Sequence, residues 1–290
     1  MLKHVVFTVL LVFFTCLGFA SSWKLKSDLS VSLNQGYYSD NWAGSELGSV
    51  SWNSSSNTSL EGEVIPRLQS VNTLKMSFGQ THRQIKSTDL QLSWEKPSKS
   101  TDKISFESIL KFRTGIIVDP YLSGKWDSQF LDQSDPQQTI IFNPSGFTEA
   151  IGIFVPILQQ EHQSLNFRLG AAMRQFVNRE VYHPETNDFQ TDILSDSGLE
   201  FISAYERKIS EPETKLNSRL SLYQAIVNSE SDLPESNWKA LDVRWENSIT
   251  TKIWGALNMS FGVDVKYEKE EDDAIQIKQT MGVSLTYILF

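Results

Sequence analysis

The chain has 290 residues, 40% of them hydrophobic, and its 35 acidic side chains outnumber 26 lysines and arginines to give a formal net charge of −9. An acidic chain without a basic patch lacks the charge that nucleic acid requires of its partners, so nucleic-acid binding is excluded as a main function. The length is sufficient for one large domain or two modest ones.

The N-terminus has the pattern of a secretory signal peptide. Lys3 precedes an apolar run over 5–17, and small residues stand at and near Ala20. This order predicts a signal peptide over residues 1–20 that is cleaved between Ala20 and Ser21. An uncleaved anchor helix is the alternative, but the apolar run is too short to span a bilayer comfortably.

The exported part of the chain, residues 21–290, is expected to form a single domain. Cys16 is the only cysteine and leaves with the signal, which excludes disulfides and thiolate metal sites in the rest. No long apolar run follows residue 20, so the sequence predicts no membrane-spanning helix.

Apolar and polar residues alternate along most of the chain. In LNMSFGVDVKY, residues 257–267, every odd position is apolar and every even position is polar or glycine, which is the pattern of a strand with one apolar face. The same pattern predicts thirteen strand segments, which in chain order are 24–35, 45–55, 57–67, 72–82, 88–96, 103–115, 146–158, 163–177, 197–208, 214–228, 238–249, 253–267 and 275–289.

The connections between these segments are expected to be of two kinds. Those at 159–162 and 210–213 are tight, whereas 116–145, 178–196 and 228–237 are long. Segments of about ten residues with short turns at one end and long loops at the other are typical of an antiparallel up-and-down transmembrane β-barrel. Because single-chain barrels of this kind have even strand numbers, thirteen segments predict about twelve to fourteen strands.

A secreted β-sandwich or jelly roll is the competing fold, since it shares the alternation and the signal peptide. The charged residues opposite most apolar rows disfavour it. Aromatic residues near segment ends also suggest the girdles of a membrane barrel, although they occur in sandwiches too. These aromatics are Trp42, Trp94, Trp238, Trp254, Tyr267 and Tyr287.

The chain ends on Phe290, directly after an alternating segment. Outer-membrane barrels typically end on such an aromatic residue, and the barrel-assembly machinery is expected to recognise it. An aromatic usually stands two residues before the terminal Phe. Here Tyr287 stands three before it, which predicts a bulge or a frayed last residue.

Several stretches resemble an uncharacterised family of bacterial outer-membrane β-barrels, known only as a domain of unknown function. They are the C-terminal third from SNWKALDVRW onward, SDNWAGSELGSVSWN, LKMSFGQT, LKFRTG and FNPSGFTEAIGIFVPI. The resemblance covers most of residues 23–290 and rests on the order of the pieces. It implies the barrel fold and the outer membrane of a bacterium with two membranes, but no activity.

The polar faces of the strands supply the candidate functional residues, which we expect to face the lumen. They are Arg113, Arg168, Arg174, Arg244, Asp264, Lys266 and Lys278. Arg113 has two possible roles: a lumen charge that tunes a pore, or one half of a salt bridge that only stabilises the barrel. We favour the salt bridge, because a buried charge needs a partner.

No catalytic or cofactor site is predicted. His82, His162 and His183 lie at strand ends or in loops, without an evident serine nucleophile beside them. The acidic stretches 183–188 and 268–273 lack the spacing of a calcium loop, and no phosphate-binding glycine loop is present.

Three functions stay open for an outer-membrane barrel of this kind. We prefer a passive channel for small polar solutes, because the inner face carries charges of both signs. A filled structural or surface-interaction barrel is the second, and a lipid-modifying enzyme is the third and least favoured. The expected partners are outer-membrane lipid and the assembly machinery.

The last hairpin permits a prediction of register. Pairing 253–267 with 275–289 so that Tyr267 lies opposite Ile275 brings Leu257 opposite Leu285. This register puts the apolar row towards lipid and sets Asp264 opposite Lys278 inside the barrel. A slip by one residue would turn these charges towards lipid, at about 2–4 kcal/mol for a lysine near the midplane.

Overall fold

The computed structural model describes residues 23–36, 47–86, 92–134, 138–183, 188–211, 213–229, 235–270 and 272–288. These residues form an all-β fold in which twelve antiparallel strands close into one barrel, which confirms the predicted fold class. The barrel strands are β1 (Lys24–Gly36), β2 (Ser49–Ile65), β3 (Leu68–Lys86), β5 (Ser98–Phe112), β6 (Asp119–Ser128), β9 (Ser145–Gln160), β10 (Gln163–His183), β11 (Asp188–Ile209), β12 (Thr214–Asn228), β13 (Leu241–Trp254), β14 (Leu257–Tyr267) and β15 (Gln276–Ile288).

Four short elements lie in the connections, namely β4 (Leu92–Trp94), β7 (Leu131–Asp132), β8 (Ile140–Ile141) and α2 (Glu235–Trp238). Among the described residues, no helix is long and apolar enough to cross a membrane. The predicted signal peptide, Trp42 and Phe290 lie outside the described residues, so their roles stay predictions.

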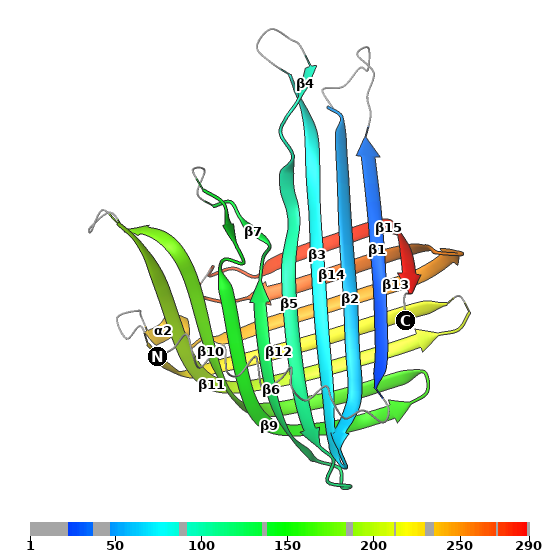
Figure 1. The fold of residues 1–290 in the computed structure, drawn as a ribbon, viewed down its shortest axis with the longest axis vertical. Coiled ribbons are helices and arrows are strands. Elements are labelled where there is room, and N and C mark those ends of the chain that lie inside the picture. The colour runs from blue at the N-terminus through cyan, green and yellow to red at the C-terminus, as the bar shows by residue number, and fades with distance from the viewer. Residues whose placement is uncertain are drawn as a thin grey trace.

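The barrel closes where the first strand meets the last. β1 pairs with β2 on one side and with β15 on the other, with Val31 opposite Leu285, and the pairing of β2 with β3 completes the ring (Figure 1). Each strand of the described wall therefore has a neighbour on both sides. A closed wall pairs the backbone N–H and C=O groups without leaving an exposed edge.

The two ends of the barrel differ. Short connections at 66–67, 113–118, 161–162, 210–213 and 255–256 lie at the end where β1 begins and β15 ends. The opposite end carries the longer connections 37–48, 87–97, 129–144, 229–240 and 268–275, together with the tip of the long β10–β11 hairpin. The β3–β5 and β10–β11 hairpins project beyond the wall at this end (Figure 1).

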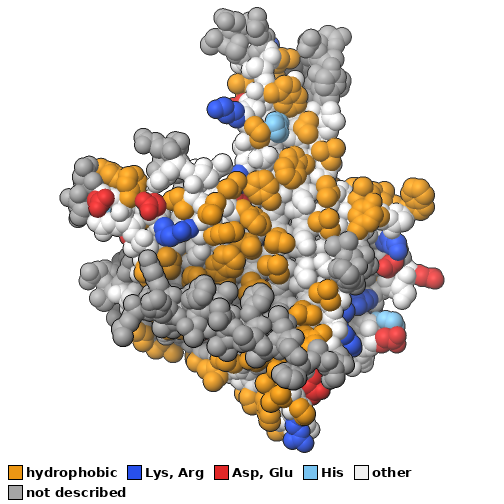
Figure 2. Space-filling model, in the orientation of Figure 1, with side chains coloured by type: hydrophobic (Ala, Val, Ile, Leu, Met, Phe, Trp, Pro, Cys, Tyr) orange, Lys and Arg blue, Asp and Glu red, His pale blue; other side chains and the backbone are white. Residues whose placement is uncertain are grey.

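The pairing registers divide the side chains into an inward and an outward row. In the last hairpin Leu257 lies opposite Leu285 and Asp264 opposite Lys278, so the predicted register is confirmed over the paired residues of β14. Large apolar side chains on the outward row are exposed, as in the orange surface of Figure 2. They include Leu29, Val31, Ile151, Ile153, Leu169, Leu199, Ile249, Met259, Phe261, Met281, Val283 and Leu285.

Three of the predicted segments were wrong. Segments 45–55 and 57–67 belong to the single strand β2, whose alternation is hidden because Ser54, Ser56 and Thr58 occupy outward positions. The predicted strand 88–96 contains only β4, which pairs with the end of β3 beyond the barrel wall.

Two predicted loops also contain strands. The predicted loop 116–145 includes the barrel strand β6, which lacks a clear alternation because Gly124 breaks its outward row while Tyr121 points inward. Most of the predicted loop 178–196 belongs to β10 and β11, which continue beyond the wall as a polar hairpin. Joining two segments, removing one and adding β6 changes thirteen strands into twelve.

The buried hydrophobic core lies on the inward row of one wall. It consists of Tyr121, Ala150, Ala172, Tyr223 and Ala225. The Tyr121 ring lies against the backbone of β10, where a Cβ atom added to Gly170 would stand only 2.7 Å from the Tyr121 hydroxyl. Glycine at position 170 is therefore required for this close packing.

Candidate functional site: the barrel lumen

A cavity of about 220 Å³ lies inside the barrel and is lined by residues of β3, β5, β6 and β9 to β13, and by Glu268 just after β14. Seven cationic side chains and five carboxylates line it. The cations are Lys75, Lys103, Lys125, Arg168, Arg174, Arg219 and Arg244, and the carboxylates are Glu107, Glu200, Asp242, Glu246 and Glu268. The cavity is smaller than the ~300 Å³ at which sites for drug-sized ligands begin, so it fits small solutes only.

Glu107 of β5 is the centre of the most buried charge cluster. Its Oε1 accepts a hydrogen bond from Arg168 Nη2 at 2.7 Å and lies 3.4 Å from Arg219 Nη2. Arg168 is on β10 and Arg219 is on β12, so this one carboxylate joins three strands that are not neighbours. The side chains of Arg168 and Glu107 are only 7% and 15% exposed, which makes each dependent on the other for its charge.

A second cluster surrounds Arg174 of β10. Its guanidinium contacts Asp196 at 2.6 Å and Asp242 at 2.8 Å, and it lies over the Tyr223 ring at 3.6 Å from the ring centroid. The Tyr223 hydroxyl donates to Asp196 Oδ1 at 2.6 Å. With two carboxylates and one guanidinium in contact, this cluster has an excess of negative charge, whereas Glu107 contacts two guanidinium groups and Glu200 adds a second carboxylate near Arg168.

A third cluster joins opposite walls of the barrel. Glu246 of β13 lies 3.6 Å from Lys103 of β5 and 3.5 Å from Arg244 of its own strand. Five strands separate β5 from β13 in either direction around the barrel. The Lys103–Glu246 ion pair therefore crosses the lumen and narrows it.

The remaining wall of the lumen has small polar side chains. Inward positions of β1, β2, β14 and β15 carry mostly serine, asparagine, threonine and glycine, and none of the described inward residues on these four strands is buried. At Gly282 an added Cβ atom would meet no other atom within 4 Å. This side of the lumen is therefore accessible, in contrast to the side occupied by the charge clusters.

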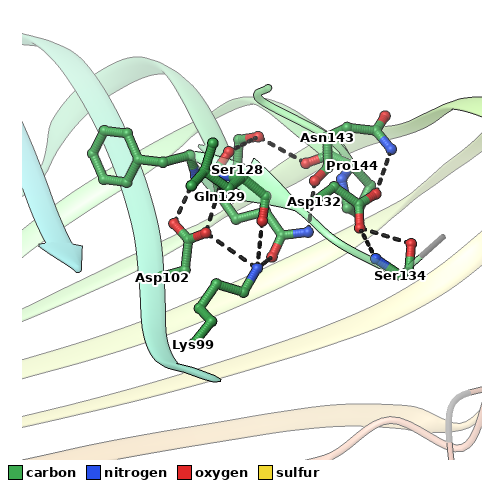
Figure 3. A network of polar contacts seen from close by, with 10 residues as sticks. Lys99, Asp102, Ser128, Gln129, Asp132, Ser134, Asn143 and Pro144 are labelled. Atoms are coloured by element: carbon green, nitrogen blue, oxygen red, sulfur yellow. Dashed lines mark hydrogen bonds and ion pairs between the residues drawn. The ribbon is translucent and has the colours of Figure 1, made fainter. Parts of the chain in front are cut away.

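The connection 129–144 is fixed to the barrel at the end with the longer connections (Figure 3). The Asp102 carboxylate accepts the N–H groups of Phe130 at 2.6 Å and Leu131 at 3.0 Å, and it lies 3.1 Å from Lys99 Nζ. Gln129 Nε2 donates to the Asn143 carbonyl at 2.6 Å. The first end of the connection is thus held to β5, and its other end is held to the first.

Asn143 is 1% exposed and links this connection to β10. Its amide donates to Asp132 Oδ2 at 2.7 Å and to Asn178 Oδ1 at 2.8 Å, while its oxygen accepts the Arg179 N–H at 2.8 Å. Burial raises the pKa of Asp132, but hydrogen bonds from Ser134 and Asn143 outweigh it, so this pKa lies below its usual value of 3.8.

The predicted lumen residues fall into two groups. Arg168, Arg174 and Arg244 line the cavity, and each has a carboxylate partner. Arg113 lies just beyond β5 at the short-connection end, where its guanidinium donates to Gln69 Oε1 at 2.9 Å instead of pairing with a carboxylate.

The other three predicted residues belong to the last hairpin. Lys266 pairs with Glu268 at 3.1 Å. Asp264 and Lys278 lie opposite each other, as the register predicted, but no ion pair within 4 Å joins these two described residues. Asp264 is half-buried and Lys278 is exposed, so the two residues are opposite each other in the strand register without forming an ion pair.

Sequence reasoning missed the residues that complete the clusters. Arg219 and Lys103 lie in the predicted segments 214–228 and 103–115, but the alternation of one strand does not reveal which charged residues meet across the lumen. Tyr121 lies in β6, which was not recognised as a strand. The inward-facing Asp196 was assigned to a loop, although its alternation with Gly198 and Glu200 was a usable signal.

The histidines lie apart from the cavity lining. His162 occupies the turn between β9 and β10, and His183 ends β10 with its Nε2 2.9 Å from Asp192 Oδ1. In the described parts of the chain, no group of three or more histidine, cysteine or acidic residues is arranged to hold a metal ion.

No family model and no curated protein match this chain, so the resemblance to an uncharacterised family stays a prediction. Solved structures with similar folds include an outer-membrane channel from Pseudomonas putida F1, with 11% identity, 93% of this chain and 96% of that chain covered, and a TM-score of 0.46.

The translocator domain of the autotransporter NalP from Neisseria meningitidis is also similar, with 9% identity, coverage of 98% of this chain and 95% of that chain, and a TM-score of 0.35. The β domain of the Bordetella autotransporter BrkA has 9% identity, coverage of 92% and 99%, and a TM-score of 0.37. Likeness at this level does not transfer an activity, so the function must be inferred from this chain's own residues.

Proposed function

We propose that the protein is an integral outer-membrane β-barrel that acts as a passive channel for small polar solutes. The outward row supports the membrane location. Its exposed leucine, isoleucine, valine and methionine side chains surround a closed barrel whose backbone groups are paired within the wall. An apolar surface of this extent is costly in water but favourable in a bilayer.

The accessible polar wall is the observation that carries the channel proposal. The small inward side chains of β1, β2, β14 and β15 face a lumen whose charged residues are partly accessible, with Lys103 and Arg244 side chains 42% and 44% exposed. Water and small polar solutes are stabilised along such a surface. The Lys103–Glu246 ion pair narrows the path and restricts it to small molecules.

A filled structural barrel is the second candidate. The buried Glu107 and Arg174 clusters favour it, because they occupy one side of the lumen with ion pairs that water reaches only in part. We do not propose a lipid-modifying enzyme, since His162 and His183 lie at turns and rims and His82 near the end of β3.

Single-channel recording of the refolded protein in a planar bilayer tests the proposal. We expect discrete conductance steps from the wild type. Gly282→Trp places a large side chain in the open side of the lumen and should lower the conductance several-fold. Gly124→Trp is the matched control, because Gly124 lies on the outward row and also has open space around it. A folded wild-type protein without conductance would favour the filled barrel.

A further inference from the structure

The pairing that closes the barrel is the shortest in its wall. It joins Asp28–Ser32 of β1 to Ser284–Ile288 of β15 over five residue pairs, whereas the next shortest, between β5 and β6, has eight. Among the described residues, no pairing joins β1 to β15 beyond this stretch. Neither strand ends there, because β1 stays paired with β2 as far as Gly36 and β15 with β14 as far as Gln276. The two strands therefore diverge towards the end with the longer connections (Figure 1).

Side chains become more exposed where the two strands separate. On the outward row of β1, Val31 is 47% exposed inside the paired stretch and Leu33 is 64% exposed beyond it. Met281, on the outward row of β15, is 73% exposed. Several inward residues beyond the paired stretch are also exposed, namely Asn34, Gln276, Lys278 and Thr280. Both faces of both strands are accessible here, as expected beside a gap in the wall.

This gap, bordered by residues 33–36 and 276–283, begins at the level of the bilayer. A barrel strand needs about nine to eleven residues to cross the membrane, and β15 pairs with β1 over only five. Beyond that stretch the outward row continues with apolar side chains, which are Leu33, Ile277, Met281 and Val283. Such side chains suit lipid, so the strands separate within the apolar band and not only at the aqueous mouth of the barrel.

The backbone along the gap requires water. Unpaired N–H and C=O groups are costly in hydrocarbon, and membrane proteins tolerate them where they line a water-filled cavity. The lumen supplies that water, since the inward positions beside the gap carry Asn34, Thr280 and Gly282. A single added strand does not remove the cost, because a strand that pairs with β15 leaves the diverging edge of β1 unpaired. The gap thus has a polar inner border and an apolar outer border.

We propose that this gap is a lateral opening of the lumen that binds single-chain amphiphiles. A small polar head hydrogen-bonds the backbone groups and the polar inward side chains, while the alkyl chain lies against Leu33 and Met281 in the bilayer. Gly282 leaves room for the head, since an added Cβ atom there would meet no other atom within 4 Å. The inference rests on the membrane location in the proposed function, but not on conductance.

Cysteine labelling in proteoliposomes tests the opening, with Cys16→Ser as the background because Cys16 is the only cysteine. Gly282→Cys lies at the gap. Thr250→Cys is the matched control, because Thr250 is half-buried and belongs to the same inward register row, two strands further from the gap. A dodecyl maleimide dissolved in the bilayer should label Gly282→Cys at least tenfold faster than Thr250→Cys. Equal rates from the bilayer would overturn the inference.

Disulfide formation measures the separation of the strands independently. In the register of the paired stretch, Asn34 would lie opposite Gly282 if the wall were closed. Cysteines at these two positions should therefore oxidise at least tenfold more slowly than the control pair Ser30→Cys and Thr286→Cys, whose native hydroxyl oxygens are 2.7 Å apart. Similar rates for the two pairs would mean that the wall is closed at this level and would exclude the opening.

Fluorescence quenching tests the ligand class. Bimane attached at Gly282→Cys should be quenched saturably by doxyl-labelled stearate, and unlabelled stearate should restore the fluorescence. Bimane at Thr250→Cys should be quenched several-fold less. Quenching that rises linearly, without competition by stearate, would mean that the gap only contacts bulk lipid, which contradicts an amphiphile site.

Conductance distinguishes failure of this inference from failure of the proposed function. Channel activity in potassium chloride, with equal labelling of the two cysteines from the bilayer, means that the channel proposal holds and the lateral opening does not exist. Selective labelling of Gly282→Cys in a barrel that never conducts means that the opening exists and the channel proposal is wrong.

Discussion

Lys103 and Glu246 meet across the lumen at a distance of 3.6 Å, although they lie on strands that are as far apart around the barrel as twelve strands allow. A wall of this circumference holds opposite strands too far apart for such a contact unless the barrel is flattened there. The pair therefore bridges the lumen and narrows it at this level. It also identifies two side chains whose removal should change the passage of ions more than it changes stability.

The first prediction concerns this pair. Both side chains are more than 30% exposed, so water screens their attraction and Lys103→Gln should cost at most about 1 kcal/mol of unfolding free energy. The same change removes a positive charge from a side chain that crosses the lumen. Urea unfolding should therefore be almost unchanged, while the reversal potential in a salt gradient shifts towards cation selectivity. Lys96→Gln is the control and should change neither, because Lys96 is an exposed residue in the connection before β5, outside the cavity lining.

The buried Glu107 cluster should behave in the opposite way. Glu107→Gln leaves Arg168 and Arg219 without their shared carboxylate, and we expect a loss of about 3–5 kcal/mol because the buried guanidinium keeps its charge. Arg168→Met should cost less, since Arg219 still neutralises Glu107. The two losses of unfolding free energy are compared by urea titration, in which heat-modifiable migration on gels reports the fraction of folded barrel. An equal or reversed order would show that Arg219 does not share the carboxylate.

The barrel class and its final register follow from the sequence because alternation is physically enforced there. On β14 and β15 one row is almost entirely apolar and the other polar, so a slip by one residue would turn Asp264 and Lys278 outward. β2 and β6 lack this constraint. Ser54, Ser56 and Gly124 interrupt their outward rows, and a period-two pattern is harder to recognise where polar or small residues interrupt the apolar row.

The charge clusters depend on which strands face each other, and a single sequence does not contain that information. Arg168 and Arg174 were predicted as inward residues from their own strand. Their partners Glu107 and Asp242 lie on β5 and β13, each three strands away from β10, so these contacts form across the curved wall and not between paired strands. The burial of Arg168 Nη1 without a hydrogen-bond partner among the described residues is further removed from the sequence, since it depends on side-chain geometry.

A third prediction concerns the connection 129–144. Asn143→Ala removes hydrogen bonds to Asp132, Asn178 and Arg179 at a buried position. We expect the opening of this connection to become easier by about 1–3 kcal/mol, or roughly 5- to 150-fold. Chymotrypsin cleavage after Phe130 or Phe142 should accelerate accordingly, while the barrel stays resistant and heat-modifiable. An unchanged cleavage rate would mean that other contacts hold the connection.

The same connection should open in acid. The folded pKa of Asp132 lies below its unfolded value of 3.8, so the stabilisation from this carboxylate is complete above pH 3.8 and is lost as the pH falls through the folded pKa. Pepsin cleavage within 129–144 should therefore accelerate in that range. Asp132→Asn should be cleaved readily throughout and show little dependence on pH. A wild-type rate independent of pH would exclude Asp132 as the responsible group.

The fourth prediction concerns orientation. With β15 ending at the periplasmic side, the connections 129–144, 184–187, 229–240 and 268–275 should lie outside the cell. Epitopes inserted beside Asp188, or at Asp232 outside the described residues, should be labelled on intact cells. An epitope in 210–213 should be labelled only after the outer membrane is opened. The reverse pattern would invert the barrel in the membrane.

The last prediction uses the register of the final hairpin, in which Lys278 lies opposite Asp264 on the inward row. A cysteine at Lys278 should react with a membrane-impermeant maleimide in proteoliposomes, because the lumen is accessible to water there. A cysteine at Ile277, on the outward row, should react instead with a reagent dissolved in the bilayer. Lys278→Cys that reacts only from the lipid would contradict the assignment of faces.

Lys278→Met then separates the channel from the filled barrel. Lys278 is exposed and no ion pair ties it to Asp264, so in an open lumen the change should lower the unfolding free energy by at most about 1 kcal/mol and alter ion selectivity. In a filled lumen Asp264 would lose the cation beside it, at about 3–5 kcal/mol, and neither protein would conduct. The exposure of Lys278 favours the first result, because water that reaches this ammonium group screens its interaction with Asp264.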